Sequence, residues 1–189
     1  DAMADSAKAR LAGIRYEREV GGTALPDGTT VPTKREDQSM AHGAYQALQG
    51  LSYYGGTFLF FNDLSADNAV HTGSFQFYTD AARNQLRPEN SAVEGIWNDL
   101  YDGINRANHI ILRVPDIDDL TESERAHILG EAHLLRALHY HNLVRLWGDV
   151  PVRTEPITGP DEASQIERAP EADVYAQILS DLEVARSGL

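Results

Sequence analysis

The sequence contains no cysteine, which excludes disulfide bonds, thiolate metal sites and cysteine nucleophiles from these 189 residues. Lysine occurs only at Lys8 and Lys34, and acidic residues outnumber basic ones by 29 to 16. The resulting net charge of −13 repels phosphate backbones and anionic lipid heads, so we expect neither nucleic acid as a partner nor electrostatic docking to a membrane. No apolar run approaches membrane-spanning length, and residues 1–30 have no signal-peptide core.

Patterns that carry catalysis or metal binding are also missing. The sequence has no phosphate-binding loop, and its histidines do not have the HExxH spacing of a zinc site. His133, His139 and His141 would point in different directions from one helix, and residues 116–119 lack the spacing of a calcium loop. The carboxylates are scattered over positions that we expect to face solvent. We therefore predict a protein that is not an enzyme and that has no cofactor and no metal.

Helical patterns cover most of the chain. Capping boxes of the form Ser/Thr-x-x-Glu at Thr33, Ser91 and Thr121 predict three helix starts. Residues 21–33 are rich in Gly, Pro and Thr and are predicted to form a linker or a hairpin-like loop. Residues 67–90 show no helical or strand period and are predicted to form a long ordered loop. The predicted helices cover residues 2–19, 33–51, 57–66, 91–114 and 121–147, with a last helix from Pro170 whose buried stripe is Val174, Ile178, Leu182 and Ala185.

The helix predicted for residues 121–147 differs from the others because apolar residues surround most of its axis. Such a helix packs on several sides, so we expect it to be the central one. Arg136 lies inside this apolar surface and needs a carboxylate or carbonyl partner, which makes it a predicted bridge between helices. Trp97 and Trp147 are predicted to lie in the core. The fold class is therefore all-α, with antiparallel helix pairs, long irregular loops and little strand.

Aromatic residues gather between Tyr53 and Tyr78. Phe58, Phe60 and Phe61 are predicted to pack into the core. Phe75, Phe77 and Tyr78 alternate around Gln76 as an extended segment would, which exposes one side. Rings with polar neighbours are typical of small-molecule sites, because sugar C–H faces stack on rings while polar groups bind the hydroxyls. The predicted ligand-binding residues are Asp67, Asn68, His71, Phe75, Phe77 and Tyr78.

Five elements occur in a specific order and spacing along the predicted helices. They are Gly43-Ala44-Tyr45-x2-Leu48, Trp97-x2-Leu100-Tyr101-x2-Ile104-x2-Ala107-Asn108-x-Ile110-Ile111, Glu131-Ala132-x-Leu134-Leu135-Arg136-Ala137-x2-Tyr140-x2-Leu143, Gly148-Asp149-Val150-Pro151 and Val174-Tyr175-x2-Ile178-Leu179-x-Asp181-Leu182-x2-Ala185. Through these elements, residues 34–189 resemble the N-terminal, tetratricopeptide-like part of the SusD/RagB-type nutrient-binding outer-membrane lipoproteins.

The resemblance implies a tetratricopeptide-like helical array whose irregular loops form the ligand face. It implies a non-catalytic, surface-exposed lipoprotein of the outer membrane that captures glycans or other nutrients for a TonB-dependent, SusC-like transporter. Members of the family are longer and have a lipidated N-terminal cysteine, so the chain is interpreted as a fragment whose anchor is not present. Residues 1–33 match no part of the family.

Two other functions stay open from the sequence. A helical-repeat module could bind a protein or peptide on its concave face. A glycoside hydrolase fragment would need two facing carboxylates, for which the sequence gives little support.

Overall fold

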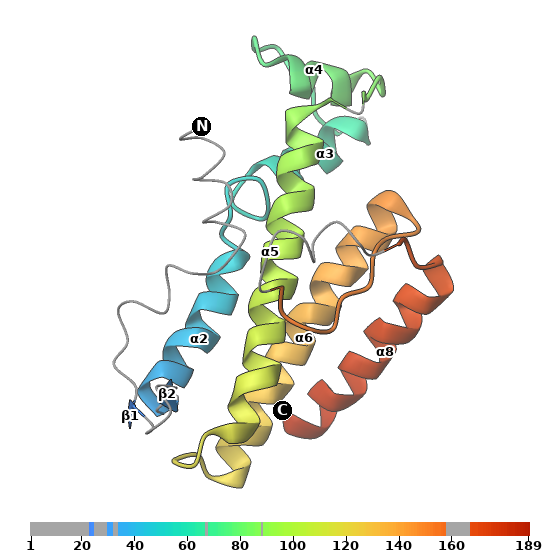
Figure 1. The fold of residues 1–189 in the computed structure, drawn as a ribbon. Helices are drawn as coiled ribbons and strands as arrows, with labels where there is room; N and C mark the ends of the chain where they lie inside the picture. Colours follow the sequence, from blue (N-terminus) through green and yellow to red (C-terminus); the bar gives the residue numbers. More distant parts are fainter. Residues whose placement is uncertain (1–22, 25–29, 32–33, 67, 88, 158–166) are drawn as a thin grey trace.

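The computed structural model describes residues 23–24, 30–31, 34–66, 68–87, 89–157 and 167–189, and its helices lie side by side (Figure 1). The predicted helix over residues 2–19 lies outside the described residues. Two strands of two residues, β1 (Thr23–Ala24) and β2 (Thr30–Val31), pair antiparallel within the segment predicted as a linker or hairpin-like loop. The all-α prediction is confirmed by α2 (Lys34–Ala47), α3 (Thr57–Ser65), α4 (Gln76–Ala82), α5 (Ser91–Arg113), the 3-10 turn η1 (Val114–Asp116), α6 (Glu122–Trp147) and α8 (Glu171–Gly188).

Helix α6 is the central helix, as its apolar circumference predicts. It packs against α2, α5, α8 and η1. In Figure 1, α2, α5, α6 and α8 lie in that order across the molecule, so that α8 is the outermost helix on one side. The main core joins α5, α6 and α8 to α3, and its fully buried side chains include Leu100, Ile104, Leu143 and Val174.

The start of α5 differs from the predicted capping box. The N-cap is Asn90 rather than Ser91, and its side chain accepts hydrogen bonds from the backbone N–H groups of Ala92 and Val93. Asn is among the best N-cap residues because its short side chain reaches those unpaired donors. Helix α2 ends at Ala47 instead of continuing to residue 51, and Leu51 is 80% exposed in the turn that follows.

The capping box at the start of α6 is confirmed and gives the first prediction. The backbone N–H of Glu124 donates to the Thr121 hydroxyl, and the Glu124 carboxylate accepts from the Thr121 backbone N–H. Replacing Thr121 by alanine removes one of these two bonds and should lower the free energy of unfolding by about 1 kcal/mol. Urea denaturation measures the change, and Ser123→Ala, at an exposed position of the same turn, is the control. An unchanged urea midpoint in Thr121→Ala would contradict the assigned cap.

Helix α8 buries a different stripe from the predicted one. Val174, Ile178 and Ala185 are buried as predicted, but Leu182 is 39% exposed and Asp181 is buried in its place. The spacing of Val174, Ile178, Asp181 and Ala185 is the i, i+4, i+7, i+11 spacing of a single helix face. A carboxylate occupies this face because Arg136 of α6 lies opposite to it.

No helix in the described part of the chain is both long and apolar enough to cross a bilayer.

Candidate functional site

The aromatic segment forms one end of the molecule. Helices α3 and α4 lie together beside the first turns of α5, at the top of Figure 1. The loop predicted for residues 67–90 contains α4, so the prediction that Phe77 and Tyr78 lie on an extended segment was wrong. Of the three aromatic residues, Phe75 precedes the helix as its N-cap and has extended backbone angles. A helix of seven residues has too few positions for its period to be recognised in the sequence.

Helix formation brings the predicted rings into mutual contact. The Phe75 and Phe77 rings are stacked with centroids 5.4 Å apart, and the Phe77 and Tyr78 centroids are 4.4 Å apart. The His71 ring lies 5.5 Å from that of Tyr78. Phe75 is 59% exposed, whereas Phe77 and Tyr78 are partly buried against the core. Phe77 and Tyr78 thus anchor the cluster to the core, and Phe75 presents its ring to solvent.

Phe60 of α3 belongs to the same cluster, which corrects the prediction that it packs into the core. Its ring lies 6.1 Å from that of Tyr78 in an edge-to-face arrangement, and the residue is 57% exposed. Phe58, Phe61 and Leu64 are buried and share one face of α3. Their three-residue spacing was the signal that Phe60 lies off the buried face. We call Phe60, His71, Phe75, Phe77 and Tyr78 the ring cluster.

The described polar residues near the rings form hydrogen bonds with other residues. Asn68 is exposed, and its backbone N–H donates to the carbonyl of Asp63. Asp67 lies outside the described residues. Gln76 is exposed and donates to the Asp80 carboxylate at 2.6 Å. The structure therefore brings together four of the six predicted site residues and adds Phe60 to them.

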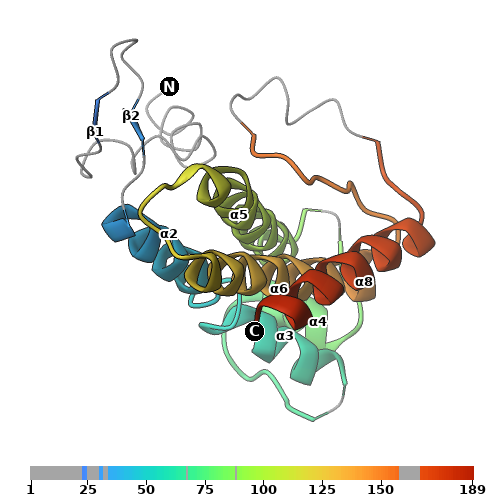
Figure 2. The same ribbon diagram turned by 90° about the horizontal axis from the view of Figure 1, so that it is seen from below.

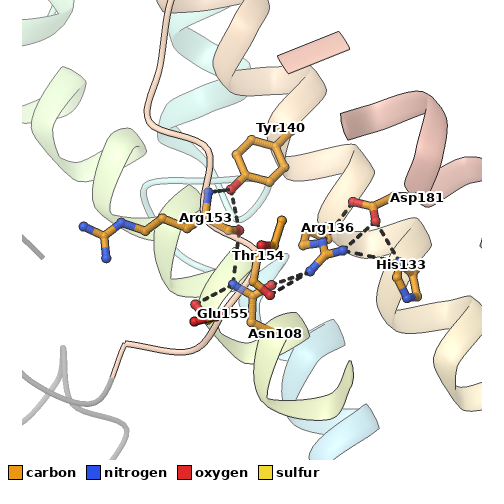
Figure 3. Close-up of polar contacts among 8 residues, drawn as sticks. All are labelled: Asn108, His133, Arg136, Tyr140, Arg153, Thr154, Glu155 and Asp181. Atoms are coloured by element: carbon orange, nitrogen blue, oxygen red, sulfur yellow. Dashed lines mark hydrogen bonds and ion pairs between the residues drawn. The ribbon is translucent and has the colours of Figure 1, made fainter. Parts of the chain in front are cut away.

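A second concentration of polar groups lies between α5, α6 and α8 (Figure 3). Arg136 donates from Nε and Nη2 to both carboxylate oxygens of Asp181, at 2.9 and 2.6 Å. Its Nη1 donates to Asn108 Oδ1 at 2.7 Å, and His133 Nδ1 lies 2.7 Å from Asp181 Oδ1. Arg136 and Asp181 are almost fully buried. Arg136 thus bridges α6 to α8, as predicted for a buried arginine.

Every ionic group in this network has a partner of opposite charge or a hydrogen bond. Burial acts to raise the pKa of Asp181, but the hydrogen bonds from His133 and Arg136 outweigh it and hold that pKa below its ordinary value. Arg136 and Asp181 are buried, and their hydrogen bonds join α6 to α5 and α8, so the network holds these helices together.

The network also holds an extended segment, residues 150–157, against α5 and α6. The Asn108 amide donates to the carbonyls of Arg153 and Glu155, and the Tyr140 hydroxyl donates to that of Arg153 at 2.7 Å. The Tyr101 hydroxyl donates to the Pro151 carbonyl at 2.8 Å. The described residues contain no group of three or more His, Asp or Glu side chains that could hold a metal ion. The ring cluster is the stronger candidate for ligand binding because Phe60 and Phe75 expose their rings, whereas the Arg136–Asp181 pair is buried.

Comparison with known proteins identifies relatives over most of the chain. Residues 30–189 match the SusD-like family model described as "Starch-binding associating with outer membrane". Two curated relatives come from Formosa agariphila. SusD-like protein P38 is 35% identical over 148 residues, which cover 77% of this chain and 28% of the relative. SusD-like protein P25 is 32% identical over 155 residues, which cover 76% of this chain and 29% of the relative.

Solved structures show the same fold. A laminarin-binding SusD-like protein superposes with a TM-score of 0.74 at 30% identity, over 83% of this chain and 34% of that protein. A SusD superfamily protein from Bacteroides thetaiotaomicron superposes with a TM-score of 0.72 at 26% identity, over 84% of this chain and 38% of that protein. The chain thus spans less than a third of the length of the two curated relatives.

Proposed function

Because the chain belongs to the SusD-like family, we propose that it is part of a non-catalytic protein that captures glycans at the cell surface and delivers them to a SusC-like, TonB-dependent transporter. We propose that this protein is held at the outer membrane by a lipid anchor. The observation that supports glycan binding most directly is the membership in a family described as starch-binding. The laminarin-binding relative extends that support to other glycans.

Within this chain, the ring cluster is the proposed contact with the saccharide. Phe60 and Phe75 present exposed rings on two helices, and Tyr78 lies between them, 6.1 and 6.2 Å from their centroids. Exposed aromatic rings placed side by side give a saccharide apolar faces on which to stack. Asp67, Asn68 and His71 are proposed to bind hydroxyl groups beside the rings. The core contacts of Phe77 and Tyr78 hold the cluster in place, which limits the entropy lost on binding.

Removal of either exposed ring should weaken glycan binding. Phe75→Ala and Phe60→Ala should each lower the affinity for a bound oligosaccharide by about 2- to 10-fold, the range that one aromatic contact supplies. Isothermal titration calorimetry with laminarin and starch oligosaccharides measures the affinity. Leu112→Ala is the matched control, because Leu112 is 60% exposed near the opposite end of α5.

The variants also separate the competing functions. Saccharide affinity that is unchanged in both Phe variants would show that the saccharide binds outside the ring cluster. Binding of peptides in the absence of any saccharide response would favour a protein-interaction module. Release of reducing ends from a bound polysaccharide would contradict the proposed non-catalytic role.

A further inference from the structure

An exposed carboxylate lies beside one of the exposed rings. Asp63 of α3 is three residues from Phe60, so the two side chains are neighbours on the surface of the helix. Both residues are exposed and lie off the buried face of α3. Helices α3 and α4 lie side by side in both views of the molecule (Figures 1 and 2), and the edge-to-face contact of Phe60 with Tyr78 joins this side of α3 to α4. Asp63 therefore adjoins the ring cluster.

The backbone of Asp63 is tied to the segment that carries His71. Its carbonyl accepts a hydrogen bond from the Asn68 N–H at 3.1 Å, and the His71 ring, three residues further along, contacts Tyr78. The carboxylate of Asp80, on α4, is occupied differently, because Gln76 donates to it within the same helix. Asp63 thus holds an exposed carboxylate at a fixed place next to a ring.

Cations are scarce in this part of the chain. No lysine occurs after Lys34, and the arginines within residues 57–90 are Arg83 and Arg87. Arg83 is the C-cap of α4, at the far end of that helix from Phe75, and Arg87 follows it by four residues. An anionic group bound across the exposed rings would therefore meet the Asp63 carboxylate before either guanidinium.

Arg145, in the last turn of α6, is engaged elsewhere. It donates to Asn142 Oδ1 at 2.6 Å, and the Asn142 amide donates to the hydroxyls of Tyr53 and Tyr54. The Tyr54 ring in turn lies 5.3 Å from that of Phe58, which belongs to the buried face of α3. The contacts of Arg145 therefore lie on the buried side of α3, not on the side of Phe60 and Asp63.

We propose that Asp63 restricts the ring cluster to uncharged saccharides, by accepting hydrogen bonds from hydroxyl groups of a sugar that stacks on Phe60. An ionised carboxylate only accepts hydrogen bonds, so it suits hydroxyl groups and repels a uronate or sulfate group at the same place. The net charge of −13 adds a repulsion at longer range. This inference rests on the proposed glycan binding at the ring cluster, and it adds the class of glycan and the residue that selects it.

Saccharides that share a backbone and differ in charge test the proposal. Isothermal titration calorimetry on the full-length gene product compares laminarin and starch oligosaccharides with their sulfated derivatives, at low and at high salt. Sulfation should lower the affinity at least 10-fold, or about one unit in log Kd, at low salt. The difference should shrink as salt rises, because salt screens exposed charges.

Variants of Asp63 separate its charge from the bulk of the sulfate groups. Asp63→Asn should weaken binding of the neutral oligosaccharide by about 2- to 10-fold, since a charged acceptor is replaced by a neutral one. Asp63→Lys should raise the affinity for the sulfated derivative at least 10-fold. Asp118→Lys is the matched control, because Asp118 is exposed in the turn between α5 and α6, at the opposite end of α5 from the ring cluster (Figure 1), and changes the net charge equally.

The results distinguish this inference from the function on which it rests. Sulfated derivatives that bind the unaltered protein as tightly as the neutral ones would overturn the inference and leave glycan binding intact. Equal gains in Asp63→Lys and Asp118→Lys would overturn it as well, because net charge would then be the cause. An unchanged affinity for the neutral oligosaccharide in Asp63→Asn would remove the hydrogen-bonding role. Absence of binding by every saccharide would overturn the proposed glycan binding, and this inference with it.

Discussion

Replacement of Asp181 by alanine is expected to lower the free energy of unfolding by about 3–5 kcal/mol. The substitution leaves the Arg136 guanidinium almost fully buried without its carboxylate, and a buried charge that loses its partner carries its full cost of desolvation. The hydrogen bond from Arg136 to the Thr154 carbonyl, at 3.3 Å, should loosen as well, because the same side chain makes both contacts.

Chemical denaturation monitored by circular dichroism measures this loss. Glu183→Ala is the matched control, since Glu183 forms an exposed ion pair with Arg186 on the same helix and should cost less than 1 kcal/mol. Addition of Arg136→Met to Asp181→Ala should recover part of the lost stability by removing the unpaired charge. A double variant no more stable than Asp181→Ala alone would argue that the ion pair is not the cause.

Acidification is expected to destabilise the protein between pH 6.5 and about 3 through His139. This residue is fully buried against the Gly103 backbone, and neither of its ring nitrogens has a hydrogen-bond partner. Burial, with a contribution from the Arg106 charge, lowers the pKa of His139 to about 3 from its ordinary 6.5. In this range the unfolded chain binds a proton at His139 and the folded chain does not. Stability should therefore fall by about 1.4 kcal/mol per pH unit as the pH decreases.

Two carboxyl groups, those of Asp181 and Asp99, also change the pH dependence of stability, and they act in opposite directions. The lowered pKa of Asp181 adds a further loss only below about pH 4, where the unfolded carboxyl takes up its proton. Burial raises the pKa of Asp99, which works the other way because the folded state takes up this proton more readily. His139→Leu should flatten the stability profile between pH 6.5 and 4, whereas His141→Ala, at an exposed position, should leave it unchanged. A slope that persists in His139→Leu would place the acid sensitivity elsewhere.

The long helices were predictable because many positions in each of them indicate the same helical period and the same ends. The apolar stripe of α5 and the capping box of α6 determine their extents to within about a residue. The partner of Arg136 was predictable as a type of group but not as a residue. An arginine within an apolar surface needs a carboxylate or carbonyl partner, and only the packing of α8 on α6 shows that this partner is the carboxylate of Asp181.

The ring cluster was harder to predict, because it depends on short elements. Phe77 and Tyr78 lie on a helix of seven residues, and Phe75, Gln76 and Phe77 at its start alternate in the manner of a strand. Phe60 was assigned to the core on the general tendency of phenylalanine to be buried, yet α3 is covered on one side only. The sequence shows where the aromatic residues gather, whereas the rings that are exposed became clear only from the packing.

Residues 150–157 are attached to the helices through backbone carbonyl groups. The position of this segment is therefore independent of the side chains that it exposes. Asn108, Tyr140 and Arg136 bind carbonyl oxygens of Arg153, Thr154 and Glu155, which any residue types would supply. The exposed side chains of Thr154 and Glu155 can accordingly change in evolution or by design while the trace of the chain stays fixed. The helices thus fix the backbone of this segment and leave its exposed side chains free to vary.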